Sequence, residues 1–207
     1  MARKKGMNNK NRKLKKKYIY FFMEGSKNCS EDKYIKEYYG QFQDKAVDIG
    51  FRFISCGDGS WKNIEKEINK EKRSIIDENI EIWCVLDKDK NDLDKINKEC
   101  LKNNYKLIFS NCSFEVWLLY HYENIKIGEC SQKNYENILT RKLNKKYKKS
   151  EGIKFTLDDK ERAIRQSKKI HEKYQRLEEK INNSFNCTNF YMILEKFKEV
   201  FYNFDLE

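Results

Sequence analysis

The chain has 207 residues, a formal net charge of +11 and no proline, and 37% of its residues are charged. This length suits one domain, or one domain with an appendage, and allows a substantial hydrophobic core. Its seven cysteines form no CxxC pair, and neither a signal peptide nor an apolar run of membrane length is visible. The composition therefore argues against a disulfide-stapled secreted scaffold and against a membrane protein, and indicates a reducing, cytoplasmic compartment.

The positive charge is concentrated in two zones. Residues 1–17 contain nine Lys or Arg and no acid, and residues 141–180 have a net charge of +8. Residues 18–140, between them, have a net charge of −4. Basic zones attract phosphate groups, which favours a nucleic-acid partner. Each zone taken alone is equally compatible with a solvated tail or a solvated helix face.

Strands and helices are predicted to alternate after a disordered basic arm at 1–17, which has no apolar periodicity. The apolar runs predict strands at 18–23, 51–57, 81–89 and 105–111, and helical periodicity follows each of them. This order predicts an α/β fold with a mainly parallel sheet and helices on both faces. After residue 125 the pattern is helical only. We therefore expect an α/β core at 18–125 and a helical extension, packed on the core, at 126–207.

Two of the predicted strands end on acidic residues. The first runs into Glu24, and the third runs into Asp87 and Asp89. Since ligands of an open parallel sheet bind at the carboxyl ends of its strands, these three carboxylates are expected to converge on one edge. Clustered carboxylates need a counter-ion, and Mg²⁺ binds carboxylates together with water and substrate phosphate. A loop or a helix cap without any metal is the alternative interpretation of the DKDKND segment.

Four segments resemble, in order, the characteristic blocks of RloB-like proteins. These segments are YIYFFMEGSK, WCVLDKDKND, FSNCSFEVWLLYHY and NCTNFYMILEKF. The pattern SNxxFExWLLxH is the most specific of them. It is carried by Ser110, Asn111, Phe114, Glu115, Trp117, Leu118, Leu119 and His121.

The resemblance implies a Toprim-like (Rossmann-like) fold and a metal-dependent nuclease effector of bacterial antiphage defence. Family members are often encoded beside an SMC/ABC-type ATPase, as in the RloA–RloB and AbiL abortive-infection pairs. Glu24, Asp87 and Asp89 match the catalytic, metal-binding acids of Toprim folds, with Mg²⁺ or Mn²⁺ as cofactor. The substrate implied is DNA or RNA, including tRNA, and a homo-oligomer is compatible with the pattern.

One difference from the family keeps a second function open. Ser26 stands where the opening motif of the family has another glutamate. The chain is therefore also compatible with a non-catalytic partner or sensor subunit that docks on the ATPase through its last helix.

Several further residues have candidate roles. Glu115 either completes the metal site or only complements the dipole of the helix that it begins. Asn111 either caps that helix, as Cys112 could, or contacts phosphate, and the spacing of His121 with Trp117 favours a packing role for this histidine. The residues expected to contact nucleic acid are Lys27, Asn111, Lys145, Lys146, Lys148, Lys149, Arg162 and Arg165.

Overall fold

The computed structural model describes residues 17–42, 49–57, 60–74, 80–89, 91–175 and 186–202. The strands are β1 (Lys17–Met23), β2 (Ile49–Ser55), β3 (Ile80–Asp87), β4 (Lys106–Asn111) and β5 (Cys187–Thr188). The helices are α1 (Ser30–Gly40), α2 (Trp61–Ser74), α3 (Leu93–Lys102), α4 (Glu115–Leu119), α5 (Gln132–Leu143), α6 (Leu157–Gln175) and α7 (Tyr191–Tyr202). Apart from Lys17, which begins β1, the predicted basic arm lies outside the described residues.

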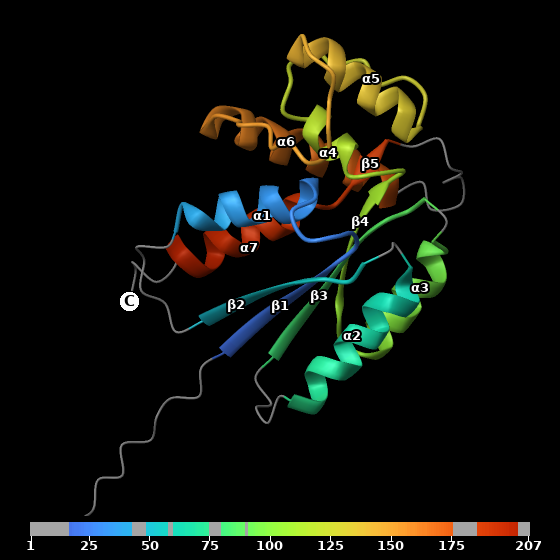
Figure 1. Ribbon diagram of the computed structural model, residues 1–207, viewed down its shortest axis with the longest axis vertical. Helices are drawn as coiled ribbons and strands as arrows, with labels where there is room; N and C mark the ends of the chain where they lie inside the picture. The colour runs from blue at the N-terminus through green and yellow to red at the C-terminus, as the bar shows by residue number, and fades with distance from the viewer. Residues whose placement is uncertain are drawn as a thin grey trace, which may run out of the picture.

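The five strands form one sheet in the order β2-β1-β3-β4-β5, and β1 to β4 are parallel. Helices cover both faces of the sheet (Figure 1), and alternate side chains of β1 belong to different core clusters. Ile19, Phe21 and Met23 join the core beneath α1 and α4 to α7, whereas Tyr20 and Phe22 join the core beneath α2 and α3. The expected α/β class with a mainly parallel, Rossmann-like sheet is confirmed. None of the described helices is both long and apolar enough to cross a bilayer.

The strand order creates a switch point between β1 and β3. The connection from β1 leads outward to β2 on one side, and the chain then returns to place β3 on the other side. The two strands are neighbours in parallel register, with Met23 opposite Val85. Crossovers that leave in opposite directions open a crevice beyond the carboxyl ends of such strands, where doubly wound folds bind ligands.

The segment after residue 125 also contributes a strand, so the expectation of helices alone is wrong there. In β5, Cys187 and Thr188 pair antiparallel with the end of β4. Asn189 extends this pairing, because its side chain accepts from the Phe109 N–H at 2.7 Å and donates to the Leu107 carbonyl oxygen at 2.9 Å. A two-residue strand held by a side chain has no periodicity that the sequence could display.

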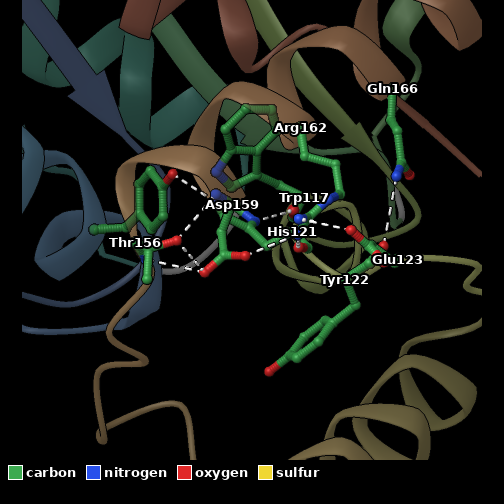
Figure 2. Close-up of polar contacts among 9 residues, drawn as sticks. Trp117, His121, Tyr122, Glu123, Thr156, Asp159, Arg162 and Gln166 are labelled. Carbon is green, nitrogen blue, oxygen red and sulfur yellow. Dashed lines mark hydrogen bonds and ion pairs between the residues drawn. The ribbon is translucent and has the colours of Figure 1, made fainter.

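A buried histidine connects α1, α4 and α6. The Nδ1 of His121 lies 3.0 Å from the carbonyl oxygen of Trp117, and its Nε2 lies 2.8 Å from the hydroxyl oxygen of Tyr34. Because a carbonyl oxygen only accepts, Nδ1 carries the proton and Nε2 accepts from Tyr34. Arg162 donates to the His121 carbonyl oxygen and pairs with Asp159 (Figure 2). Burial lowers the pKa of His121 to about 3, so the ring is neutral and has a packing role at neutral pH, as expected.

We expect Tyr34→Phe to destabilise the protein through this histidine. The variant leaves the buried Nε2 of His121 without a donor, which typically costs about 1 to 3 kcal/mol. Urea denaturation of variant and parent measures the cost. Tyr39→Phe is the control, because Tyr39 is only partly buried on the same helix and contacts Phe51 and Phe53 through its ring. Equal losses in both variants would contradict the role assigned to the Tyr34 hydroxyl.

Candidate functional site

Glu24 and Asp87 meet at the switch point. Oε2 of Glu24 accepts the backbone N–H of Asp87 at 2.8 Å, and the backbone N–H of Glu24 donates to the Val85 carbonyl oxygen at 2.9 Å. The chain turns away from β1 at Gly25, whose φ of +93° favours glycine. A Cβ at Gly25 would also lie 3.0 Å from Sγ of Cys29. The expected proximity of the acids that end β1 and β3 is therefore present.

Two further carboxylates come from helices at the same edge. Glu31 lies in the first turn of α1, and Glu115 begins α4 directly beyond β4. The Glu115 side chain is fully buried, and its Oε1 accepts from the hydroxyl of Tyr147 at 3.2 Å. Its Oε2 is buried without a hydrogen-bond partner. A buried carboxylate oxygen of this kind is costly unless something binds it.

These acids act on one another. Loss of solvent raises the pKa of Asp87 well above its ordinary value, and the charges of Glu31, Glu24 and Glu115 raise it further. Burial raises the pKa of Glu31 to about 6, and the charge of Glu115 contributes to the shift. Charges in a partly buried region act on one another over several ångströms, so these effects place Glu24, Glu31, Asp87 and Glu115 around the same edge of the sheet, and we call them the carboxylate cluster.

The loop between α5 and α6 brings a cation to the cluster. The Nζ of Lys149 lies 3.3 Å from Oε1 of Glu115. Burial lowers the pKa of Lys149, but the charges of Glu115, Glu31 and Asp87 outweigh this effect, and the net shift is upward. Lys149 is therefore a charged partner of the cluster, whereas the sequence suggested only a phosphate-binding lysine of the second basic zone.

Other predicted site residues lie apart from this group. The side chain of Asp89 is exposed, and its backbone N–H donates to the Cys112 carbonyl oxygen at 3.3 Å. Lys27 is exposed in the turn before α1. Asn111 is buried as the last residue of β4, and the N-cap of α4 is Phe114, which makes no side-chain cap bond. The cap expected from Asn111 or Cys112 is therefore not formed.

The predicted basic residues fall into two groups. The first lines a hollow of about 220 Å³ next to Tyr147 and consists of Lys145, Lys146 and Lys148, with Lys154. Lys145 and Lys148 each pair with Glu151 at 2.9 Å. The second group consists of Arg162 and Arg165 on α6, and of these Arg165 is exposed.

Arg162 belongs to an internal network instead. Its guanidinium pairs with Asp159 at 2.7 Å and with Glu123 at 3.1 Å and donates to the His121 carbonyl oxygen (Figure 2). Only 22% of its side chain is exposed. These contacts hold α6 against the end of α4, and phosphate would have to compete with two carboxylates for this arginine.

Sequence reasoning missed Glu31 and Tyr147 as members of the site. Glu31 is one of two acids in the first turn of a helix, which is the usual place for acids that favour the helix dipole. Tyr147 lies in a lysine-rich segment with no motif. The one available signal was that Glu31 follows the first strand within a few residues, at the edge where the other acids were expected.

The chemistry of the carboxylate cluster suits a hard divalent cation. Carboxylate oxygens are the protein ligands that Mg²⁺ prefers, and a cation would relieve both the repulsion at Asp87 and the unpartnered Oε2 of Glu115. Over the described residues, no three acidic, histidine or cysteine side chains are arranged as a metal-binding group. The cluster therefore offers the charge and the type of donor atom that Mg²⁺ binds, but not a ready coordination geometry.

Fold and site together define a doubly wound α/β protein with acidic residues at the switch point of its sheet. The family model described as RloB-like protein matches residues 19–197. The chain belongs to the RloB-like family, and the resemblance found in the four sequence blocks is confirmed. A search of curated proteins and a search of solved structures each returned no match.

Proposed function

We propose that this protein is a divalent-metal-dependent nuclease effector of a bacterial antiphage defence system, acting in the cytoplasm on DNA or RNA. The observation that supports this most is the carboxylate cluster at the β1/β3 switch point, where folds of this class bind ligands. The RloB-like resemblance adds a Toprim-like catalytic pattern and an SMC/ABC-type ATPase as the expected partner. A homo-oligomer remains a further prediction, which light scattering on the purified protein tests.

The residues of the carboxylate cluster have different roles in this proposal. Glu24 and Asp87 would hold Mg²⁺ or Mn²⁺, with Glu115 as a further oxygen donor. Asp89, the other predicted ligand, is exposed and lies apart from the cluster. The chemistry that such an ion would supply is an activated water and stabilisation of the leaving oxygen of a phosphodiester. Glu24 is the candidate general acid or base. Its carboxylate is oriented by the backbone N–H of Asp87, which donates to Oε2 at the carboxyl ends of β1 and β3.

Nucleic acid is proposed to lie along the loop between α5 and α6. Lys145, Lys146 and Lys148 are exposed there, next to Tyr147, which contacts Glu115. A phosphate backbone on these lysines would pass close to the carboxylate cluster. Lys27 and Arg165 are retained as further contacts, whereas Asn111 is buried and is not one of them. Arg162 contributes only if phosphate displaces its carboxylate partners.

Replacing Lys145 and Lys148 together by Gln should lower the salt dependence of nucleic-acid binding. Two lost phosphate contacts should reduce the slope of log K against log[salt] by about 1.4 to 1.8, depending on whether the ligand is single- or double-stranded. Fluorescence anisotropy at several salt concentrations measures the slope. Lys95→Gln with Lys98→Gln is the control, because both lysines are exposed on α3, on the opposite face of the sheet. An unchanged slope in the loop variant would remove this loop from the interface.

The deciding experiment is cleavage by the purified protein. Labelled duplex DNA, single-stranded DNA and tRNA are incubated with Mg²⁺, Mn²⁺ or EDTA, with and without an SMC/ABC-type ATPase of the kind that family members are paired with. We expect cleavage of at least one substrate with Mg²⁺ or Mn²⁺ and none in EDTA. Cleavage that persists in EDTA contradicts the metal dependence, and the absence of cleavage under every condition contradicts the nuclease activity.

A non-catalytic partner or sensor subunit is the second candidate, and Ser26 favours it. The last helix, α7, is the docking surface expected from the sequence, but α7 has no free apolar stripe for this purpose among the described residues. The apolar stripe of α7 is buried, and Phe197 contacts Phe21 in the sheet. Docking through α7 would therefore use its polar face. Co-purification with the ATPase, combined with no cleavage in the assay above, is the result that supports this candidate.

A further inference from the structure

Lys149 occupies the position of a counter-ion within the carboxylate cluster. Its ammonium lies 3.3 Å from Oε1 of the fully buried Glu115, and the same oxygen accepts from the Tyr147 hydroxyl. Oε2 of Glu115 is buried and has no hydrogen-bond partner. The charge of Lys149 also lowers the pKa values of Asp87 and Glu31, against the larger effects that raise them. The lysine therefore interacts with several of the acids at once.

The backbone around Lys149 is anchored while its side chain is not enclosed. Tyr147 is buried two residues before it, and Lys33 of α1 donates to the carbonyl oxygen of Ser150 directly after it. The side chain of Lys149 itself is 42% exposed. Its ammonium can therefore rotate away from Glu115 into solvent without any movement of the loop, since a lysine side chain has four rotatable bonds.

We propose that Lys149 is the resident counter-cation of the carboxylate cluster and that a divalent cation binds there only in competition with its ammonium. The inference rests on the proposed function, because it takes the cluster to be the binding site for that cation. Two cations next to Glu115 would repel each other strongly in surroundings with little water. Binding of a divalent cation must therefore displace the Lys149 ammonium from Glu115. The free energy needed to break this ion pair lowers the affinity of the site for the divalent cation.

Calorimetric titration of Mg²⁺ and Mn²⁺ into the metal-free full-length protein tests the competition. Lys149→Gln should bind either ion at least about tenfold more tightly than the parent, within the range of about 5- to 150-fold that couplings between sites usually span. Lys148→Gln is the matched control, because it removes the same charge from the neighbouring residue, whose ammonium pairs with Glu151 instead. It should bind with the affinity of the parent.

A second measurement uses the parent alone and does not depend on the folding of a variant. Lys149 is acylated with acetic anhydride in EDTA and in Mg²⁺, and the modified fraction is measured by peptide mass spectrometry. Mg²⁺ should increase the rate of modification of Lys149, because the displaced ammonium lies in solvent and no longer pairs with Glu115. The rate at Lys148 should not change.

The outcomes separate this inference from the proposed function. If the parent binds Mg²⁺ and cleaves nucleic acid, but Lys149→Gln binds no more tightly and Mg²⁺ does not change the acylation of Lys149, only the competition is overturned. If Lys149→Gln binds Mg²⁺ and the parent does not, the inference is supported and the metal dependence proposed for the parent fails. If neither protein binds Mg²⁺ or Mn²⁺, both are overturned.

Discussion

Glu24→Gln and Asp87→Asn should each lower divalent-dependent cleavage by at least about a hundredfold, while both proteins remain folded. The loss follows because a metal-bound water and a neutralised phosphate together account for several kcal/mol of the barrier, and each 1.4 kcal/mol is about tenfold in rate. Gel assays under single-turnover conditions measure the loss. Asp94→Asn is the control, because Asp94 is an exposed acid in the first turn of α3, outside the cluster. Unchanged cleavage in both cluster variants would falsify the assignment of the site.

Asp87→Asn should be more stable than the parent at neutral pH, and this difference in stability should shrink as the pH falls. The pKa of Asp87 is raised in the folded protein, chiefly by loss of solvent and then by neighbouring charges, above the value of about 3.9 for an unfolded chain. Between these two values the native state binds more protons than the unfolded state, so this residue makes the parent less stable as the pH rises. Asn does not titrate and removes the penalty.

Melting curves at several pH values test this sign. The melting temperature of Asp87→Asn should be close to that of the parent near pH 4 and higher than it at neutral pH. Asp89→Asn removes the same charge from an exposed position two residues along the chain and should show no comparable gain. A gain for Asp87→Asn that is independent of pH would contradict the raised pKa of Asp87.

Trp117→Ala should destabilise the protein by about 3 to 5 kcal/mol, the usual cost of deleting a large, fully buried aromatic side chain. The Trp117 ring is fully buried and lies between Tyr34 of α1, His121 and Phe190. Since single domains are stable by only about 5 to 15 kcal/mol, this loss should leave a substantial unfolded fraction at moderate temperature. Chemical denaturation followed by circular dichroism measures the change.

Trp61→Ala is the matched control for this loss. Trp61 begins α2 on the other face of the sheet and is only partly buried. Its removal should therefore cost clearly less than removal of Trp117. Cleavage by Trp117→Ala should fall in proportion to the unfolded fraction and recover in Trp117→Phe, which refills most of the space. A loss of cleavage in a fully folded Trp117→Ala protein would instead indicate a direct role in the site.

The sequence was sufficient for the parts of this protein that depend on local periodicity. The strand YIYFFM is apolar on both faces because helices cover both faces of the sheet, and this pattern is legible without a structure. The ends of parallel strands meet at one edge, so the proximity of Glu24 and Asp87 followed from the predicted topology alone. The spacing of His121 with Trp117 likewise predicted the packing role of this histidine, and both side chains are buried.

Only the tertiary structure decided which side chains complete the cluster. Glu31 and Lys149 come from a helix start and a loop far apart in the sequence, and their encounter with Glu115 depends on how α1 and the segment between α5 and α6 pack at the sheet edge. The short strand β5 likewise depends on the edge of β4, to which Thr188 and Asn189 bond through their side chains, and not on any periodicity of its own. Sequence periodicity shows which face of a helix or strand is buried. It does not show where a loop or a helix end lies relative to distant parts of the chain, because long-range packing and charge pairing set that position.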